Sequence, residues 1–305
     1  MGAPAMAGES SDLSVSISIV NWNRRELLRQ CLRSIAEHAG SVTHEIFVVD
    51  NASTDGSREM VRAEFPQVRL IENAENLGYG RAHNQAMRRA AGRFLFLLNN
   101  DVVLLPGTLP RLVEFLEQHP DVGAAGCRYY TDATRRAIQP SAFRVYPTPW
   151  NDLLDRVIGG RLRRWAPRSD LVRGLCARWD RACPAQEASQ EVAHIVGAAL
   201  MTRREVVRQA LLFDEAFDFF FEETDWCRRL RQHGWTIAHV PEAAVVHLYS
   251  RSFAQRDDRE QIHYRSYLRY LRKHEGWVAM GAARVLHGLG RFGRAREPER
   301  ATHAP

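Results

Sequence analysis

The residues of this chain that are best suited to chemistry form an acidic block after a run of aromatic side chains. Between Phe213 and Arg229 the sequence reads FDEAFDFFFEETDWCRR, so Glu222, Glu223 and Asp225 directly follow the apolar stretch. Carboxylates that follow so many aromatic residues indicate a pocket rather than a solvated face. Acids gathered in a pocket can transfer protons or hold a cation. The sequence therefore predicts a reactive site at the start of a helix.

Three other polar groups stand at the ends of apolar runs. Asp50 closes the run EIFVVD, Asp101 follows FLFLLNN, and His247 closes AAVVH. Runs of this length and composition are typical of buried strands. Ligands bind beyond the carboxyl ends of the strands in a parallel sheet. We therefore expect these groups, together with Asn21 at the end of the first apolar run, to share one site with the acidic block.

Strand and helix patterns alternate through the first 119 residues. The strands are expected at 15–20, 45–50, 68–72 and 94–99, and the helices after Asn23 and at 57–65, 81–91 and 106–119. Alternation of this kind predicts an α/β fold with a doubly wound, mostly parallel sheet. The strand at 94–99 is almost continuously apolar, as expected when both faces of the sheet are covered.

The rest of the chain predicts additions to that sheet. Further elements are expected as a strand at 192–202, a helix over 223–234 and strands at 236–240 and 244–247. The expected division is a disordered tail over 1–12, a main domain over 13–253 with an irregular insertion over 128–191, a basic amphipathic helical extension over 254–292 and a disordered tail over 293–305.

The composition fits a globular protein with one main core. The 305 residues are 45% hydrophobic, which is enough for a large α/β domain. Five cysteines without a CxxC pair indicate neither a disulfide framework nor a zinc ribbon, and favour a reducing, cytoplasmic setting. The chain has no N-terminal apolar segment and no run of about 18 apolar residues, so we expect neither an ordinary export signal nor a membrane-spanning helix.

The net charge of +6 is concentrated late in the chain and indicates an anionic partner. Residues 156–181 interleave eight arginines with apolar side chains. This segment suits an anionic membrane surface or a lipid diphosphate, and equally a solvated helical face. Nucleic acid is less favoured, because no recognised binding module accompanies the charge. The helical segment 264–289 could dock on a membrane, on a second copy of the chain or on the main domain.

Seven motifs occur in the order in which one known family carries them. They are VNWNR from Val20, VDNASTDGS from Val49, NLGYGRAHN from Asn76, LNND from Leu98, GAALM from Gly197, the acidic block, and His247. In these motifs the chain resembles the family 2 glycosyltransferases of the A-type fold, and especially bacterial rhamnosyltransferase-like members. The resemblance implies that residues 13–253 form a Rossmann-like catalytic domain that acts in polysaccharide synthesis.

The resemblance also implies a divalent cation, Mg²⁺ or Mn²⁺, that offsets charge on the diphosphate of a nucleotide-sugar. Asp101 and His247 match the ligand positions of the family. In the motif that ends at Asp101 the family reads Asp-x-Asp, whereas this chain carries Asn99 in place of the first acid. Asn99 is therefore expected to bond the ribose or a metal-bound water. The alternative for His247 is an ordinary histidine at a strand end.

The nucleotide-sugar is expected to lie along the same edge of the sheet. Asp50 would accept the N3 proton of uracil or thymine, and Arg81 would supply charge near phosphate or ribose. The full set that the resemblance implies is Asn21, Asn23, Asp50, Asn51, Ser53, Gly78, Gly80, Arg81, Asn84, Asn99 and Asn100. The alternative for Asp50 and Asn23 is a turn and a helix cap.

The acidic block supplies the expected catalytic groups. Glu223 takes the place of the family's base, with Glu222 as the fallback. Asp225 is the third catalytic candidate and could bind acceptor hydroxyls or bond backbone amides. Gly197, Asp225 and Trp226 are expected to bind the acceptor. The alternatives are a charge pattern at a helix N-terminus for the acids and a core position for Trp226.

The sequence thus favours an inverting, metal-dependent glycosyltransferase, with rhamnose from dTDP-rhamnose as the leading donor and a polysaccharide or lipid-linked glycan as acceptor. A UDP-sugar donor, a homodimer and peripheral contact with the inner face of the cell membrane stay open. One alternative is a non-catalytic nucleotide-sugar-binding or scaffold protein of the same fold. A sugar-phosphate nucleotidyltransferase is disfavoured, because its glycine-rich loop is missing after the first strand.

Overall fold

The computed structural model describes residues 13–135, 137–143, 145–154, 188–209, 211–248 and 259–294. The basic segment singled out at 156–181 and the tails expected at 1–12 and 295–305 lie outside the described residues.

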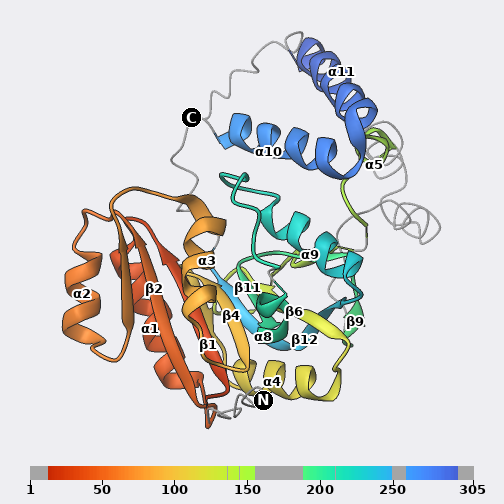
Figure 1. The fold of residues 1–305 in the computed structure, drawn as a ribbon. Coiled ribbons are helices and arrows are strands. Elements are labelled where there is room, and N and C mark those ends of the chain that lie inside the picture. The colour runs from red at the N-terminus through yellow and green to blue at the C-terminus, as the bar shows by residue number, and fades with distance from the viewer. Residues whose placement is uncertain are drawn as a thin grey trace, which may run out of the picture.

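One twisted ten-stranded sheet organises the described part of the chain (Figure 1). Its strands are β1 (Val15–Asn21), β2 (His44–Asn51), β3 (Arg69–Asn73), β4 (Phe94–Asn99), β5 (Val102–Leu104), β6 (Val122–Tyr130), β7 (Ile138–Gln139), β9 (Gln190–Glu191), β11 (Ala199–Arg203) and β12 (Thr236–His247). The order is β3-β2-β1-β4-β11-β6-β12-β5, with β7 beside β6 and β9 beside β12. Strands β8 (Ala142–Phe143) and β10 (His194–Ile195) form a separate antiparallel pair.

Helices cover both faces of the sheet. The helices are α1 (Arg25–His38), α2 (Ser57–Glu64), α3 (Gly78–Arg89), α4 (Thr108–Gln118), α5 (Pro149–Leu154), α8 (Arg204–Arg208), α9 (Glu222–Gln232), α10 (Arg259–His274) and α11 (Gly276–Arg294). Alternate residues of β4 enter different cores: Phe96 packs in the cluster that contains α1, α2 and α4, and Leu97 in the cluster that contains α3, α8 and α9. The doubly wound α/β sheet that the sequence predicts is thus confirmed.

The second half of the sheet departs from the predicted pattern. Strand β11 is antiparallel to both neighbours, β4 and β6, and the strand expected at 192–202 is divided between β10 and β11. The two strands expected at 236–247 are one strand, β12, whose register with β6 shifts between Val240 and Ala244. The helical extension expected over 254–292 is broken at Gly276, whose φ of +85° is a conformation that glycine adopts without a Cβ penalty.

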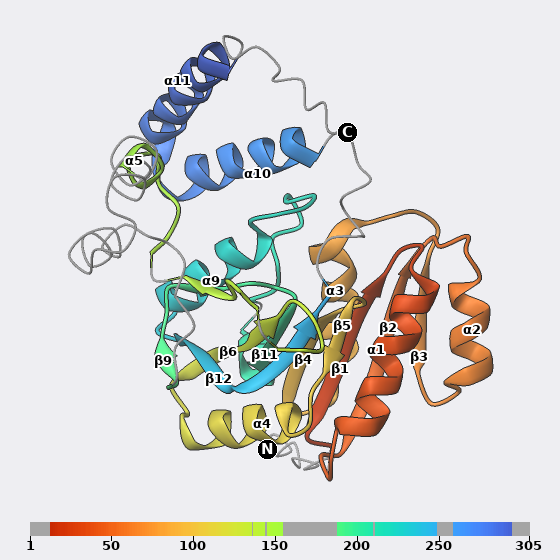
Figure 2. The same ribbon diagram turned by 180° about the vertical axis from the view of Figure 1, so that it is seen from behind.

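Helices α10 and α11 pack on the main domain as a hairpin, seen at the top of the molecule in Figures 1 and 2. Their buried side chains, among them Tyr270, Leu271 and Met280, join Phe217 in one apolar cluster. Of the three dockings considered for this segment, the structure therefore places the hairpin on its own chain. None of the helices in the described ranges combines the length and apolar character needed to cross a bilayer.

Candidate functional site

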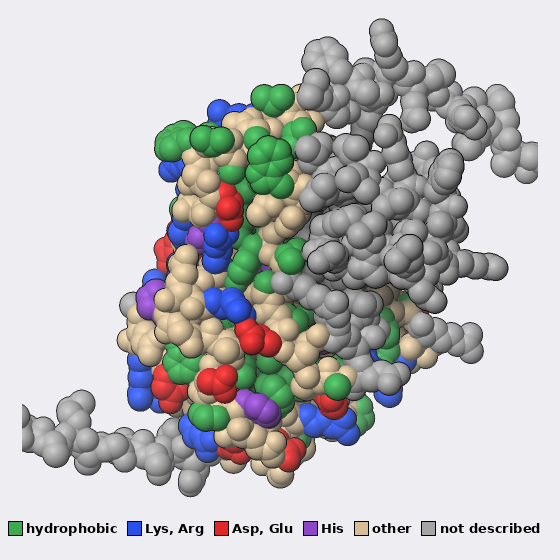
Figure 3. Space-filling model, turned by 90° about the vertical axis from the view of Figure 1, so that its right-hand side faces the viewer, with side chains coloured by type: hydrophobic (Ala, Val, Ile, Leu, Met, Phe, Trp, Pro, Cys, Tyr) green, Lys and Arg blue, Asp and Glu red, His purple; other side chains and the backbone are tan. Residues whose placement is uncertain are grey.

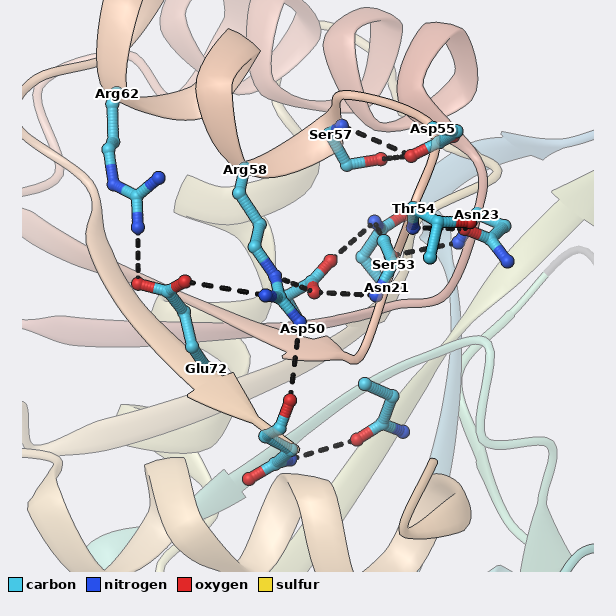
Figure 4. Close-up of polar contacts among 12 residues, drawn as sticks. Asn21, Asn23, Asp50, Ser53, Thr54, Asp55, Ser57, Arg58, Arg62 and Glu72 are labelled. Atoms are coloured by element: carbon cyan, nitrogen blue, oxygen red, sulfur yellow. Dashed lines mark hydrogen bonds and ion pairs between the residues drawn. The ribbon is translucent and has the colours of Figure 1, made fainter. Parts of the chain in front are cut away.

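A polar network fills the carboxyl ends of β1 and β2 (Figure 4). Asn21 Nδ2 donates to Asp50 Oδ2 at 3.1 Å and to Ser53 Oγ at 3.2 Å, and Asn100 Nδ2 donates to Asn21 Oδ1 at 2.8 Å. The Asn23 backbone N–H bonds Ser53 Oγ at 2.9 Å. The structure thus brings together five of the residues that the sequence assigns to the nucleotide-sugar.

Asp50 is held by a residue that the sequence reasoning missed. Its side chain is 1% exposed, and its Oδ1 accepts from Ser53 N at 2.9 Å and from Arg58 Nε at 2.6 Å. Figure 4 shows the Arg58 side chain reaching from α2 to this carboxylate. For the Asp50 carboxylate to bind a nucleobase, either Ser53 N or the Arg58 side chain would have to move away from it. The sequence signal that could have indicated this contact is that Arg58 lies in the first turn of the helix after β2, eight residues beyond Asp50.

Asn51 ties the β2 end to the loop before α3. Its Nδ2 donates to Asn76 Oδ1 and to the Gly78 carbonyl, both at 3.1 Å, and its Oδ1 accepts from Asn73 Nδ2 at 2.9 Å. Gly78 has a φ of +78°, and a Cβ there would lie 2.5 Å from the carbonyl oxygen of Asp218. The close approach at Gly78 is therefore to this chain's own backbone.

Gly80, Arg81 and Asn84 also face the segment before α9. A Cβ at Gly80 would lie 3.1 Å from the Phe213 side chain, and Arg81 Nε donates to the Glu215 carbonyl at 3.0 Å. Buried Asn84 donates to the Phe213 carbonyl and accepts from the Phe213 N–H, both at 3.0 Å. All three residues contact the start of the aromatic run, and their assignment to the nucleotide stays a prediction.

We expect Asn84→Ala to lower the free energy of unfolding by about 2–3 kcal/mol, because the buried N–H and carbonyl of Phe213 lose their hydrogen-bond partners. The KM for the donor should stay unchanged. Denaturant unfolding and donor titration of the same protein measure the two quantities. Gln85→Ala is the matched control, since half-buried Gln85 makes one bond to Asn73. A raised donor KM without loss of stability would restore the sequence-based assignment.

A cavity of about 600 Å³ lies at the carboxyl end of β4, beside the start of α9. Its wall includes five of the expected site residues: Asn99, Gly197, Glu222, Glu223 and His247. Aromatic side chains, among them Tyr79, Phe219 and Phe220, line it further. Gly197 is required here, because a Cβ would lie 2.8 Å from Tyr79 Oη. The predicted pocket of acids behind aromatic residues is therefore present.

The two glutamates at the start of α9 differ in environment. Glu222 is 3% exposed, and its Oε2 has no hydrogen-bond partner among the described residues. Burial, followed by repulsion from Glu223, raises the pKa of Glu222 well above its ordinary value. Burial also raises the pKa of Glu223, to about 7, although backbone N–H groups oppose the shift. Burial thus favours the protonated form of both carboxyls, and a pKa of about 7 places a change of charge of Glu223 near neutral pH.

The backbone leading into these glutamates is strained. Phe220 and Phe221 both have a φ of 67°, in the left-handed region that bulky residues seldom occupy. The hairpin holds them there: Ser266 Oγ donates to the Phe219 carbonyl at 2.6 Å, and the Tyr267 ring stacks on Phe221 with centroids 5.5 Å apart. The left-handed turn directly precedes both glutamates, which line the cavity.

Asp225 and Trp226 lie away from the cavity. Asp225 is fully buried; its carboxylate accepts from Arg229 at 2.8 Å and from Lys273 and His274, each at 2.7 Å. Burial alone would raise the pKa of Asp225, but the bond from His274 and the charge of Arg229 hold it at about 2. Trp226 is fully buried in the core, and its Nε1 donates to the Leu211 carbonyl at 2.6 Å. Both side chains thus contact residues of their own chain, and the acceptor contacts expected for them stay predictions.

Asp101, in the turn between β4 and β5, meets His247 at the end of β12. His247 Nε2 lies 3.4 Å from Asp101 Oδ1, a buried oxygen that has no hydrogen-bond partner in the described part of the chain. Gln139 Nε2 donates to the His247 carbonyl at 2.7 Å, which turns Gln139 Oε1 toward His247 Nδ1 at 3.0 Å. His247 therefore donates from Nδ1, and its Nε2 faces the carboxylate. Two facing acceptors require a proton or a metal ion between them.

This arrangement fits a divalent cation. A histidine ligand that donates its other nitrogen to a neighbouring oxygen is the usual second-shell pattern of metal sites. The 3.4 Å separation is close to the roughly 3 Å between adjacent ligand atoms around such an ion. Within the described ranges no three His, Cys, Asp or Glu side chains cluster for a metal ion. Asp101 and His247 would thus supply two ligands and leave positions open for oxygens of a bound substrate.

Comparison with known families matches two models to the chain. The model "Glycosyl transferase family 2" matches residues 16–168, and the model "Glycosyl transferase family group 2" matches residues 94–290. The N-acetylglucosaminyl-diphospho-decaprenol L-rhamnosyltransferase of Mycobacterium tuberculosis is 28% identical over 249 residues, which are 76% of each chain. These matches confirm the resemblance that the seven motifs indicated.

Solved structures show the same fold at low sequence identity. A mannosyltransferase from Pyrobaculum calidifontis in complex with GDP-Man and Mn²⁺ is 20% identical, with a TM-score of 0.55 over 95% of this chain and 77% of that one. GalNAc-T7 with UDP, GalNAc and Mn²⁺ is 16% identical, with a TM-score of 0.59 over 85% of this chain and 47% of that one.

Proposed function

Because the chain belongs to glycosyl transferase family 2 and uses a nucleotide-sugar donor, we propose that it transfers L-rhamnose from dTDP-rhamnose, with inversion, to a sugar on a lipid diphosphate. The choice of rhamnose and of a lipid-diphosphate acceptor is supported by the mycobacterial relative. The observation that carries the catalytic assignment is the cavity in which Glu223, Asn99 and His247 meet.

Glu223 is the proposed base. Its carboxylate accepts the proton of the acceptor hydroxyl as that oxygen attacks the anomeric carbon of the donor. The new carbon–oxygen bond forms while the bond to the diphosphate oxygen breaks, and its electron pair leaves with the nucleoside diphosphate. The raised pKa of Glu222 favours its protonated form, in which it would supply a neutral donor beside the sugar. Gly197 and Tyr79 also line the cavity, and Tyr79 Oη donates to the Gly197 carbonyl at 2.5 Å.

Asp101 and His247 are the proposed ligands of Mg²⁺ or Mn²⁺, which would lower the charge on the diphosphate as it leaves. Asn99, at the cavity wall, takes the position of the missing family acid without adding charge. The network of Asn21, Asp50 and Ser53 is the proposed floor under the nucleoside. In this role Asp50 mainly holds the Ser53 loop in place through its bond from Ser53 N.

Purified protein should convert dTDP-rhamnose and a synthetic N-acetylglucosaminyl-diphospho-prenol to a rhamnosylated product that mass spectrometry detects, with Mn²⁺ present. UDP- and GDP-sugars serve as competing donors. Donor consumption in the presence of acceptor distinguishes the enzyme from a nucleotide-sugar-binding scaffold. Turnover with a UDP-sugar alone would retain the glycosyltransferase but reject the rhamnosyl assignment.

We expect Asp101→Asn to remove the metal dependence of donor binding. In wild-type protein, dTDP-rhamnose should raise the melting temperature more with Mn²⁺ than with EDTA, because ligands that bind the native state stabilise it. The variant should show the same small shift in both conditions. Asp121→Asn, at an exposed position before β6, is the control. A metal-dependent shift that persists in Asp101→Asn would exclude Asp101 as a ligand.

A further inference from the structure

A second cavity, of about 360 Å³, lies between the C-terminal hairpin and the segment that precedes α9. Its lining residues are Ala216, Asp218, Ile262, Arg265, Ser266, Leu268, Arg269, Arg272, Met280 and Arg284. The same segment contributes Phe219 and Phe220 to the 600 Å³ cavity, and Ser266 bonds the Phe219 carbonyl. The two cavities therefore flank one short stretch of chain.

The second cavity has an excess of positive charge. Arg265, Arg269 and Arg272 recur at spacings of four and three residues, which places them along one side of α10, and Arg284 joins them from α11. With Asp218 as the acid in the lining, four positive charges and one negative charge give +3. Like charges gathered around one cavity repel each other, and an anion in the cavity offsets that repulsion.

The four arginines, all exposed, differ from other cations of this region in their pairing. Lys273 pairs with Asp214 at 2.6 Å, and Arg228 pairs with Glu275 at 2.5 Å. For Arg265, Arg269, Arg272 and Arg284, no ion pair with an acid of the described ranges occurs. Their guanidinium groups are thus available, and a guanidinium fork matches the oxygens of a phosphate.

Apolar groups adjoin this charge. Leu268 and Met280 line the cavity itself, and Arg272 lies over the ring of Trp277, 5.3 Å from its centroid. Trp277 is 69% exposed and Val278 is 86% exposed. Figure 3 shows hydrophobic and basic side chains next to each other at the top of the molecule, the end that α11 occupies in Figure 1. Cationic and apolar groups together suit a phosphate that carries a hydrocarbon chain.

We propose that the arginine-lined cavity binds the diphosphate of the lipid-linked acceptor. This inference rests on the proposed function, in which the acceptor sugar occupies the 600 Å³ cavity. In such an acceptor the sugar is joined directly to the diphosphate, and the diphosphate to the lipid. The order of sugar, diphosphate and hydrocarbon corresponds to the order of the first cavity, the arginines and the exposed apolar residues of α11.

Calorimetric titration with farnesyl diphosphate and with farnesol tests the site without catalysis. Wild-type protein should bind the diphosphate and not the alcohol. The double variant Arg265→Gln/Arg269→Gln should weaken diphosphate binding about tenfold or more, since it removes two charged donors of hydrogen bonds to phosphate oxygens. The matched control, Arg89→Gln/Arg208→Gln, removes two exposed charges from α3 and α8 and should bind as wild type. Equal binding by both variants would overturn the site.

A kinetic comparison separates this inference from the proposed function. With N-acetylglucosaminyl-diphospho-farnesol in detergent, the Arg265/Arg269 variant should show an acceptor KM raised about tenfold, with an unchanged donor KM. With an octyl N-acetylglucosaminide it should match wild type. A loss confined to acceptor in anionic vesicles would assign the arginines to the membrane surface and reject the diphosphate site. Diphosphate binding without sugar transfer by wild-type protein would reject the proposed function while retaining the site.

Discussion

Glu223→Gln should lower kcat by about 10³-fold, because the amide cannot accept the proton of the attacking hydroxyl. The substitution keeps the shape of the side chain at the cavity wall, so the KM for the donor should change little. Initial rates of product formation at saturating donor and acceptor give the comparison. A kcat within a few-fold of wild type would remove Glu223 from the reaction.

The pH dependence follows from the same residue. With a pKa of about 7, Glu223 is a carboxylate, and hence a base, above that pH, so kcat should rise with pH through about 7 and then level. For stability the sign is opposite. Burial raises the pKa above the ordinary 4.5, so the folded state favours the protonated form and loses stability as pH rises through 7. Glu223→Gln should therefore melt at a higher temperature than wild type at pH 8.

Glu222→Gln is the matched control for this assignment. Burial and the neighbouring Glu223 raise the pKa of Glu222 and so favour its neutral form, and the neutral amide of Glu222→Gln should therefore retain much more activity than Glu223→Gln and keep the wild-type pH profile. The reverse ranking of the two variants would move the base to Glu222. It would also mean that the ionisation near pH 7 is not that of Glu223 alone but is shared with Glu222.

Asp225→Ala should destabilise the protein by about 3–5 kcal/mol, because it leaves the cations of a buried cluster without their acid. Asp225 is fully buried, and its partners Lys273 and His274 belong to α10. The loss should therefore loosen the hairpin on α9 as well as lower global stability. Guanidinium unfolding and hydrogen exchange of α10 measure the two effects.

Acid provides a second readout of the same cluster. Since the pKa of Asp225 falls from 3.8 to about 2, its contribution is present above pH 4 and is lost as pH falls toward 2. The stability difference between wild type and Asp225→Ala should shrink over that range. Asp214→Ala is the control, because Asp214 is 30% exposed in its pair with Lys273 and should cost less than about 1 kcal/mol. Equal losses for both variants would contradict a special role for Asp225.

The sheet with its covering helices and the ends of its strands were predictable, because apolar strand runs alternate with helical spacing of apolar residues through α4. The cavity was also foreseeable in outline, because polar residues after parallel strands converge at one edge. Asn99, Gly197, Glu223 and His247 all line it. Their motifs are local, so a short stretch of sequence carries the signal.

Partnerships between distant segments could not be predicted. The sequence does not reveal that His274 lies beside Asp225, 49 residues away, or that Asn84 bonds Phe213, 129 residues away. Asp225 therefore resembled its neighbours Glu222 and Glu223 in sequence, although its tertiary partners give it a different charge behaviour. Likewise the antiparallel course of β11 depends on a loop path that residue patterns do not encode.

The left-handed turn at Phe220 and Phe221 relies on α10, which is made about 40 residues after it. During synthesis from the N-terminus, β1 through β12 leave the ribosome before Ser266, Tyr267 and His274 do. A nascent chain that has completed the sheet therefore still lacks the contacts that aim Glu223. Catalytic competence should consequently appear as a late step of biosynthesis, after donor recognition by the strand ends has already become available.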